Sequence, residues 1–312
     1  MPKFFWENLM LKEKIKANKS GILLYGIVPP KANLEQSEIE RISQIHKNRI
    51  ENLDIDGVVI YDLQDESART GEKRTFEFIK TIDPQIYYDE YLKTAKNAVI
   101  YRAVGKYSHD EFEKKLLNLG ENLSVFVGAS SKNQSISMSL NEAYKIKNKI
   151  APNLTLGGIC IPERHEKMQN EHLKVAQKSI FGCEFFITQA VYNAENAKNF
   201  IDDYAKLSTK KVPIIFTFTP CGSLKTLEFM KWLGISVPPF LESRLKNSID
   251  ILKSSVALST EMFDFLYKYG LAKGVSVGAN VESVSTRKVE IEASLELLKN
   301  IKNIIKKKEN GI

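Results

Sequence analysis

The sequence predicts an α/β protein of the (β/α)8 class, a TIM barrel with extra helices before the last strand. Eight short runs of β-branched and aromatic apolar residues recur along the chain. They are apolar on both faces, as strands of a parallel sheet covered on both sides must be. A stretch with helical periodicity follows each run, and eight strand–helix units favour a closed barrel over an open sheet.

The eight strands are predicted at 21–28, 57–61, 98–102, 123–127, 156–161, 185–188, 212–217 and 274–277. The helices are predicted at about 35–52, 71–82, 108–119, 139–150, 167–181, 195–207, 222–233 and 286–306. The clearest helix opens with a capping box, in which the Ser108 hydroxyl and the Glu111 carboxylate satisfy free backbone amides. It stops at Gly120, a typical C-terminal signal.

We expect one domain over residues 1–312, because no linker rich in Gly, Pro or Ser divides the chain. Two additions to the barrel are predicted. One is an N-terminal helix at about 3–18, and the other is a helical insertion at about 237–270.

The composition is that of an ordinary globular protein, with 43% hydrophobic and 27% charged residues. The net charge of +7 comes largely from scattered lysines, which indicates a solvated basic surface and no nucleic-acid partner. Cys160, Cys183 and Cys221 are too few and too far apart for a disulfide framework or a zinc knuckle. With no signal peptide and no apolar run of membrane-spanning length, we expect a cytoplasmic protein without a membrane partner.

Candidate functional residues follow the strands, because barrel chemistry sits at the carboxyl ends of the strands. The segment after the second strand carries three carboxylates and an arginine: Asp62, Asp65, Glu66 and Arg69. Such a cluster suits a cation, the amidine edge of a pterin, or an acid/base pair. Helix capping with a local Glu–Arg pair is the structural alternative.

Pro162, Glu163 and His165 follow the fifth strand, and Glu171 and Lys178 lie on one face of the next helix. This pattern favours contacts to the phosphate or ribose of a nucleotide. Glu163 and His165 have no third ligand at metal-site spacing, so we predict no metal.

The sixth strand ends in Gln189, whose amide could pair with a heterocycle or be satisfied within the core. Asn280 and Glu282 follow the last predicted strand. Walker-type, dinucleotide-binding and zinc-protease motifs are missing from the sequence.

These strand ends resemble the methylenetetrahydrofolate reductase family. The segment from Gly182 to Gln189 reads G-C-E-F-F-I-T-Q and is similar to the family's G-A-x-F-x-I-T-Q strand. The paired prolines 29 and 30, Arg69 with Thr70, Pro162-Glu163-x-His165, and Pro220 follow in family order. The resemblance runs from about residue 21 to 285 and implies a flavin-containing barrel.

The resemblance implies that His165, Glu171 and Lys178 contact the nucleotide half of FAD, and that Gln189 contacts folate and nicotinamide. The family's catalytic glutamate is replaced by Gly26 in this sequence. The Arg-Gly-Asp that ends the family's fourth strand is replaced by Val127, Gly128 and Ala129.

Acidic residues elsewhere could compensate for these replacements. We predict Glu66, Asp65 and Glu282 as catalytic groups or pterin anchors, because a carboxylate can grip the N–H edge of a pterin. Gln189, Arg69, Asp62 and Asn280 are predicted to contact the substrate.

The function that the resemblance implies is reduction of methylenetetrahydrofolate to methyltetrahydrofolate with NAD(P)H, in one-carbon metabolism and methionine biosynthesis. Two alternatives remain open. One is a pterin or one-carbon barrel enzyme without flavin, and the other is a non-catalytic folate-binding subunit. In each case we expect a small-molecule folate partner, with a homo-oligomer or a partner subunit also possible.

Overall fold

The computed structural model describes residues 10–65, 75–94, 96–129 and 135–309. Eight parallel strands form a closed barrel in sequence order, with the last strand paired to the first. The strands are β1 (Leu23–Ile27), β2 (Gly57–Ile60), β3 (Asn97–Ala103), β4 (Leu123–Val127), β5 (Leu156–Cys160), β6 (Cys183–Ala190), β7 (Ile214–Phe218) and β8 (Val277–Val281). The predicted (β/α)8 fold is confirmed.

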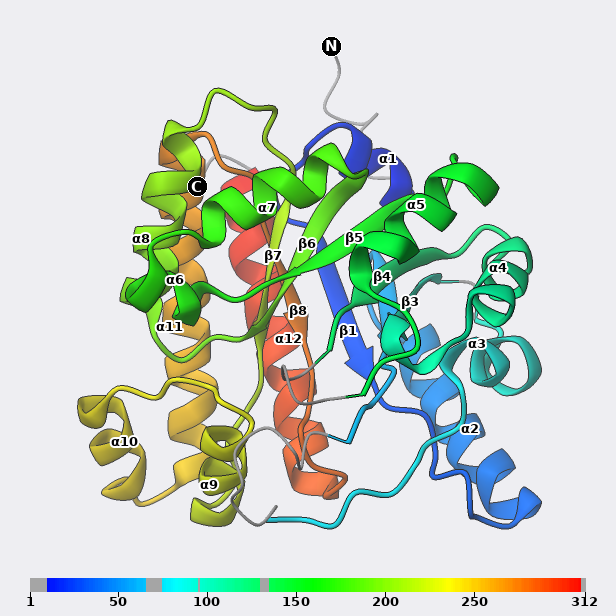
Figure 1. The fold of residues 1–312 in the computed structure, drawn as a ribbon. Coiled ribbons are helices and arrows are strands. Elements are labelled where there is room, and N and C mark those ends of the chain that lie inside the picture. Colours follow the sequence, from blue (N-terminus) through cyan, green and yellow to red (C-terminus); the bar gives the residue numbers. More distant parts are fainter. Residues whose placement is uncertain (1–9, 66–74, 95, 130–134, 310–312) are drawn as a thin grey trace.

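The helices lie around the strands (Figure 1). They are α1 (Leu11–Lys16), α2 (Gln36–Glu51), α3 (Pro84–Ile86), the π-helix η2 (Tyr87–Leu92), the 3-10 helix η3 (Val104–Lys106), α4 (His109–Leu117), α5 (Leu140–Ile150), α6 (Pro162–Met168), α7 (Glu171–Ile180), α8 (Ala194–Lys206), α9 (Leu224–Trp232), α10 (Pro239–Lys246), α11 (Ile251–Lys273) and α12 (Lys288–Glu309). No helix in the described ranges is both long enough and apolar enough to cross a membrane.

Most elements lie within a few residues of their predicted bounds, and three of the differences have a clear local cause. Residues 75–82 are not helical, and the helical segment begins at Pro84, after Asp83 caps the amides of Gln85 and Ile86. The helix predicted at 167–181 is two helices, α6 and α7, separated at Gln169 and Asn170. The last strand begins at Val277 rather than at residue 274.

Both predicted additions to the barrel, the N-terminal helix and the helical insertion before the last strand, contain helices in the structure. The N-terminal helix occupies Leu11–Lys16, and residues 1–9 are outside the described part of the chain. Within the range 237–270 the structure has α10 and most of α11.

The inside of the barrel is apolar toward the amino ends of the strands. Leu11 and Ile15 of α1 are 1% and 2% exposed and pack against the interior side chains. Those side chains are Ile22, Leu24, Val59, Val99, Tyr101, Leu123, Val125, Phe185, Ile187 and Ile215. Helix α1 therefore closes the amino end, where Figure 1 shows it at the top. The polar interior residues lie toward the carboxyl ends.

Candidate functional site

Asn280 on β8 organises the polar end of the barrel interior. Its side chain is fully buried, and its Nδ2 donates hydrogen bonds to the Tyr61 hydroxyl at 2.7 Å and to Thr217 Oγ1 at 3.2 Å. The buried Asn280 Oδ1 has no hydrogen-bond partner among the described residues. The predicted site residue Asn280 therefore lies inside the barrel, with one acceptor atom unused.

Gly26 on β1 is glycine because its neighbours fill the space beside it. A Cβ atom there would lie 2.7 Å from Cε2 of Tyr61 and 3.2 Å from Cβ of Glu282. Real Cβ atoms essentially never approach other atoms as closely as 2.7 Å. At the position where the resemblance places a glutamate, the chain thus has a glycine packed against a tyrosine and a glutamate.

Glu282 brings a carboxyl group to this same place from the adjacent strand. Because Tyr25 pairs with Val281, the residues that follow them, Gly26 and Glu282, are neighbours at the carboxyl end. Burial raises the pKa of Glu282 to about 7, although a hydrogen bond with the Tyr61 side chain acts to lower it. A carboxyl group that titrates near neutral pH can bind or release a proton there.

Asp62 points away from this cluster. Its Oδ1 lies 2.6 Å from Lys106 Nζ, and its Oδ2 accepts hydrogen bonds from the Ala103 amide at 2.7 Å and the Tyr107 hydroxyl at 3.0 Å. Successive strand residues face opposite sides of a sheet, so Tyr61 faces inward and Asp62 outward. Asp62 joins the end of β2 to η3, and its carboxylate has protein partners.

Three further residues after β2 were predicted to belong to the site: Asp65, Glu66 and Arg69. Asp65 is exposed. Glu66 and Arg69 lie outside the described residues. Gln64 reaches the end of β4, where its Nε2 donates to the Gly128 carbonyl at 3.3 Å.

Gln189 lies at the end of β6 and is half-buried. Its Nε2 donates a hydrogen bond of 2.7 Å to the Leu233 carbonyl, just after α9. The side-chain orientation is therefore fixed by the protein.

The three residues assigned to FAD by the resemblance interact with the protein. Lys178 Nζ donates to the Ile159 carbonyl at 2.6 Å. Glu171 is 2% exposed, and its Oε1 accepts from the Ile161 amide at 2.9 Å. His165 is 3% exposed, and its Nε2 lies 3.0 Å from Oδ2 of Asp203 on α8. Each of the three side chains thus has a partner within the protein.

Tyr61 and Glu163 are not among the predicted catalytic, cofactor-binding or substrate-binding residues, but their surroundings make them candidates. Tyr61 links Asn280 to Glu282, but in the sequence it reads as the last residue of an apolar run. Glu163 is buried, and both of its side-chain oxygens lack partners among the described residues. Burial and the nearby carboxylates of Glu171 and Glu166 raise the pKa of Glu163 to about 8. The sequence signal that could have identified Glu163 is its position shortly after the fifth strand.

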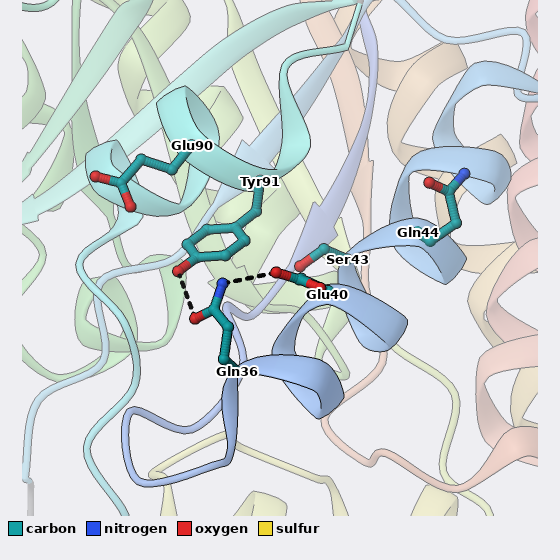
Figure 2. A pocket seen from close by; sticks show the side chains of 6 residues that line it. All are labelled: Gln36, Glu40, Ser43, Gln44, Glu90 and Tyr91. Carbon is teal, nitrogen blue, oxygen red and sulfur yellow. Dashed lines mark hydrogen bonds between the residues drawn. The ribbon is translucent and has the colours of Figure 1, made fainter.

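A cavity of about 350 Å³ lies outside the barrel, between α2 and η2 (Figure 2). Gln36 spans it, donating to Glu40 at 2.9 Å and accepting from the Tyr91 hydroxyl at 3.3 Å. None of the predicted site residues lines this cavity.

Comparison with known proteins shows what the chain is similar to. The family model of methylenetetrahydrofolate reductase matches residues 130–283. A solved structure of an uncharacterized protein from Clostridium thermocellum, which binds two copies of 5-methyl-5,6,7,8-tetrahydrofolic acid, is 52% identical in sequence. The match covers 95% of this chain and 100% of that one, with a TM-score of 0.84.

More distant structures share the fold alone. A GH10 endoxylanase retrieved from a sugarcane soil metagenome is 9% identical, with a TM-score of 0.50 over 93% of this chain and 99% of that chain. No curated protein matches the sequence.

Proposed function

The chain belongs to the methylenetetrahydrofolate reductase family, and on this premise we propose that it binds a reduced folate at the carboxyl end of its barrel. The observation that carries the proposal is the 52% identical structure that binds 5-methyltetrahydrofolic acid. The match covers nearly the whole chain, so the same barrel surrounds the candidate site.

The polar cluster around Glu282 supplies a chemical reason for the proposal. The amidine-like edge of a pterin presents N–H groups that a carboxylate accepts through two charge-assisted hydrogen bonds. Asn280 Oδ1 is a further buried acceptor without a partner in the described structure. Glu282 is thus the proposed pterin anchor, with Tyr61 and Asn280 as positioning residues.

A calorimetric titration with 5-methyltetrahydrofolate tests this site. At pH 8, above the pKa of about 7 for Glu282, we expect wild type to bind and Glu282→Gln to weaken binding by about 10- to 100-fold, because a hydrogen bond to a charged group contributes about 1.5–3 kcal/mol. Glu261→Gln, at an exposed carboxylate on α11, is the matched control and should leave the affinity unchanged. Equal affinity of Glu282→Gln and wild type would place the folate elsewhere.

A second candidate function is the family reaction itself, and the pKa of Glu282 near 7 favours it. Reduction of methylenetetrahydrofolate adds a hydride to the bridging carbon. It also delivers a proton to the nitrogen that leaves that carbon. Glu282, next to the family's glutamate position at Gly26, is the proposed proton donor, and NAD(P)H is the proposed hydride source. This role does not require His165, Glu171 or Lys178 to hold a flavin.

Oxidation of NADH and of NADPH in the presence of methylenetetrahydrofolate tests the second function, with and without added FAD. If Glu282 donates the proton, Glu282→Gln should lower kcat/KM by about 10²- to 10⁴-fold. If turnover depends on added FAD, hydride transfer passes through a bound flavin. Folate binding without turnover under any of these conditions would leave the binding role and remove the reductase role.

A further inference from the structure

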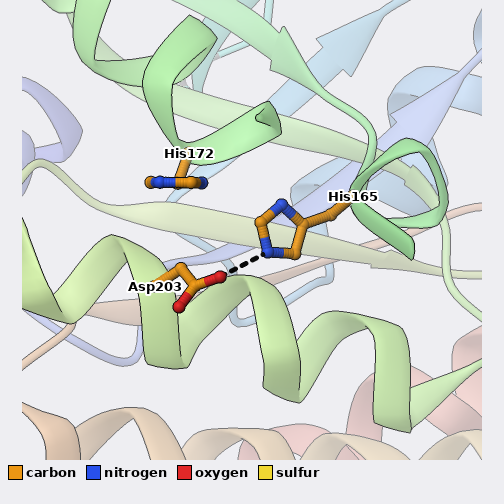
Figure 3. Close-up of side chains that lie close together, drawn as sticks. All are labelled: His165, His172 and Asp203. Atoms are coloured by element: carbon orange, nitrogen blue, oxygen red, sulfur yellow. Dashed lines mark hydrogen bonds and ion pairs between the residues drawn. The ribbon is translucent and has the colours of Figure 1, made fainter. Parts of the chain in front are cut away.

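Two histidines and an aspartate from three successive helices meet outside the barrel. Figure 3 shows His165 of α6, His172 of α7 and Asp203 of α8 facing one another. One ligand atom from each residue lies within 4.8 Å of the other two. His165 Nε2 and Asp203 Oδ2 are 3.0 Å apart, and the two imidazole rings are perpendicular, with centroids 5.1 Å apart.

The backbone between the two histidines makes this meeting possible. Helix α6 ends at Met168, and its C-cap residue Gln169 has a left-handed conformation with φ of 47°. The chain reverses there, and α7 starts two residues later, at Glu171. Phe200 of α8 packs edge-on against His165 with ring centroids 6.1 Å apart, and Asp203 lies one helical turn further on.

Both imidazoles have a nitrogen without a partner. Nδ1 of His165 and Nδ1 of His172 are buried and make no hydrogen bond in the ranges that the structure describes. Most buried polar atoms in proteins have a partner, so the unpartnered nitrogen of His172 beside the His165–Asp203 pair requires an explanation. A metal ion near the cluster would give His172 a partner and fix the orientation of both rings.

The charges of the three residues suit a cation. A carboxylate is an anionic ligand, and Asp203 Oδ1 accepts a hydrogen bond of 2.8 Å from Lys206 Nζ. A histidine binds a metal through a ring nitrogen that carries no proton. Lys206 contacts only one carboxylate oxygen in this geometry, and the other faces the histidines.

We propose that His165, His172 and Asp203 form a binding site for a divalent transition-metal ion of the zinc class, which ties α6 and α7 to α8. Two imidazole nitrogens and one carboxylate oxygen are ligands that zinc takes, with water at the fourth position. Metal–ligand bonds of about 2.0–2.2 Å in tetrahedral geometry place neighbouring donor atoms about 3.3 Å apart. The His165–Asp203 pair, at 3.0 Å, is already close to this spacing, and all three ligand atoms lie within 4.8 Å of one another.

Titration of the metal-free full-length protein with Co²⁺ tests the site, because tetrahedral Co²⁺ absorbs visible light and Zn²⁺ displaces it. Wild type should bind one equivalent. His172→Ala and Asp203→Asn should each weaken binding at least about tenfold. His109→Ala is the matched control, because His109 is exposed and lies 3.6 Å from the Glu142 carboxylate without belonging to the three-residue cluster.

Thermal unfolding gives a second readout that is independent of colour. Zn²⁺ should raise the Tm of wild type and of His109→Ala, and should leave the Tm of His172→Ala and Asp203→Asn unchanged. Both ligand variants alter partly exposed side chains, and circular dichroism without metal verifies that they fold. Equal Co²⁺ affinity in wild type, His172→Ala and Asp203→Asn, or no binding by folded wild type, would overturn the proposal. The metal site is on the outer helices α6, α7 and α8, apart from the proposed folate site, so metal binding and folate affinity are measured as separate properties.

Discussion

At the scale of single residues, the Tyr61 ring beside the end of β1 explains why residue 26 is a glycine. Gly26 has no side chain, and the Tyr61 ring occupies the space beside it. The Tyr61 hydroxyl accepts a hydrogen bond from Asn280 and contacts Glu282. The carboxyl group at the mouth of this barrel therefore comes from the end of β8, and a glutamate on β1 would compete with Tyr61 for space.

Gly26→Ala tests this packing. The added Cβ would meet Tyr61 at 2.7 Å, so we expect a loss of about 1–3 kcal/mol in the free energy of unfolding, measured by urea denaturation. Gly128→Ala, at the end of β4, is the matched control, because among the described residues a Cβ there meets Leu140 alone, at an ordinary contact distance of 3.8 Å. In a Tyr61→Ala background the cost of Gly26→Ala should fall, and a cost that stays the same would contradict the packing argument.

The raised pKa of Glu282 predicts a specific pH dependence of stability. The folded protein holds a proton on Glu282 up to about pH 7, whereas the unfolded chain releases it near pH 4.3. The stability that this proton contributes is complete below the unfolded pKa and is lost as the pH rises through 7.

Between pH 5 and pH 8 wild type should therefore lose about 2 kcal/mol more than Glu282→Gln. Urea denaturation of both proteins at the two pH values measures the difference. Buried Glu163, whose pKa is also raised, is common to both proteins and cancels. Parallel pH profiles would mean that Glu282 is ionised in the folded protein at pH 5.

At the scale of elements, α1 acts as a plug for the barrel. Its Leu11 lies against Gly57 of β2, where a Cβ atom would come within 2.8 Å of the Leu11 side chain. The six-residue helix has little intrinsic stability, so its place depends on burying Leu11 and Ile15 among the interior side chains.

Leu11→Ala should lower the free energy of unfolding by about 2–5 kcal/mol, because it leaves a cavity at the amino end of the barrel. Leu117→Ala makes the same chemical change at a 66% exposed position on α4 and should cost far less. Chemical denaturation followed by circular dichroism measures both. Equal costs for the two variants would show that α1 does not seal the barrel.

Most of the strand–helix order could be predicted because apolar runs and caps are local signals. The last strand was placed too early because Gly274 looks like a strand start. In the structure its φ of 70° ends α11. Asn280 also interrupts the apolar pattern, although it lies inside the strand. The break between α6 and α7 depends on the left-handed conformation of Gln169, and no glycine or proline at this position indicates it in the sequence.

At the scale of the whole molecule, the candidate site was only partly predictable because its contacts join distant parts of the chain. Asn280 and Tyr61 are 219 residues apart, and no local pattern indicates that they touch. The carboxylate of Asp62, which is predicted to contact substrate, also contacts Lys106 and Tyr107, and no local pattern indicates these partners more than 40 residues downstream. The family resemblance supplied the barrel and its motif order, while the position of Glu282 beside Gly26 required the strand register.

The plug formed by α1 also constrains the order of events at the opposite end. Because α1 closes the amino end of the barrel, a ligand of the candidate site must enter and leave at the carboxyl end. Two reactants that use this site must either stack in the same opening or take turns. Steady-state kinetics distinguishes these schemes, because simultaneous occupancy gives intersecting double-reciprocal lines and alternation gives parallel ones. If the two ligands alternate, the residence time of the first one limits how soon the next one can enter.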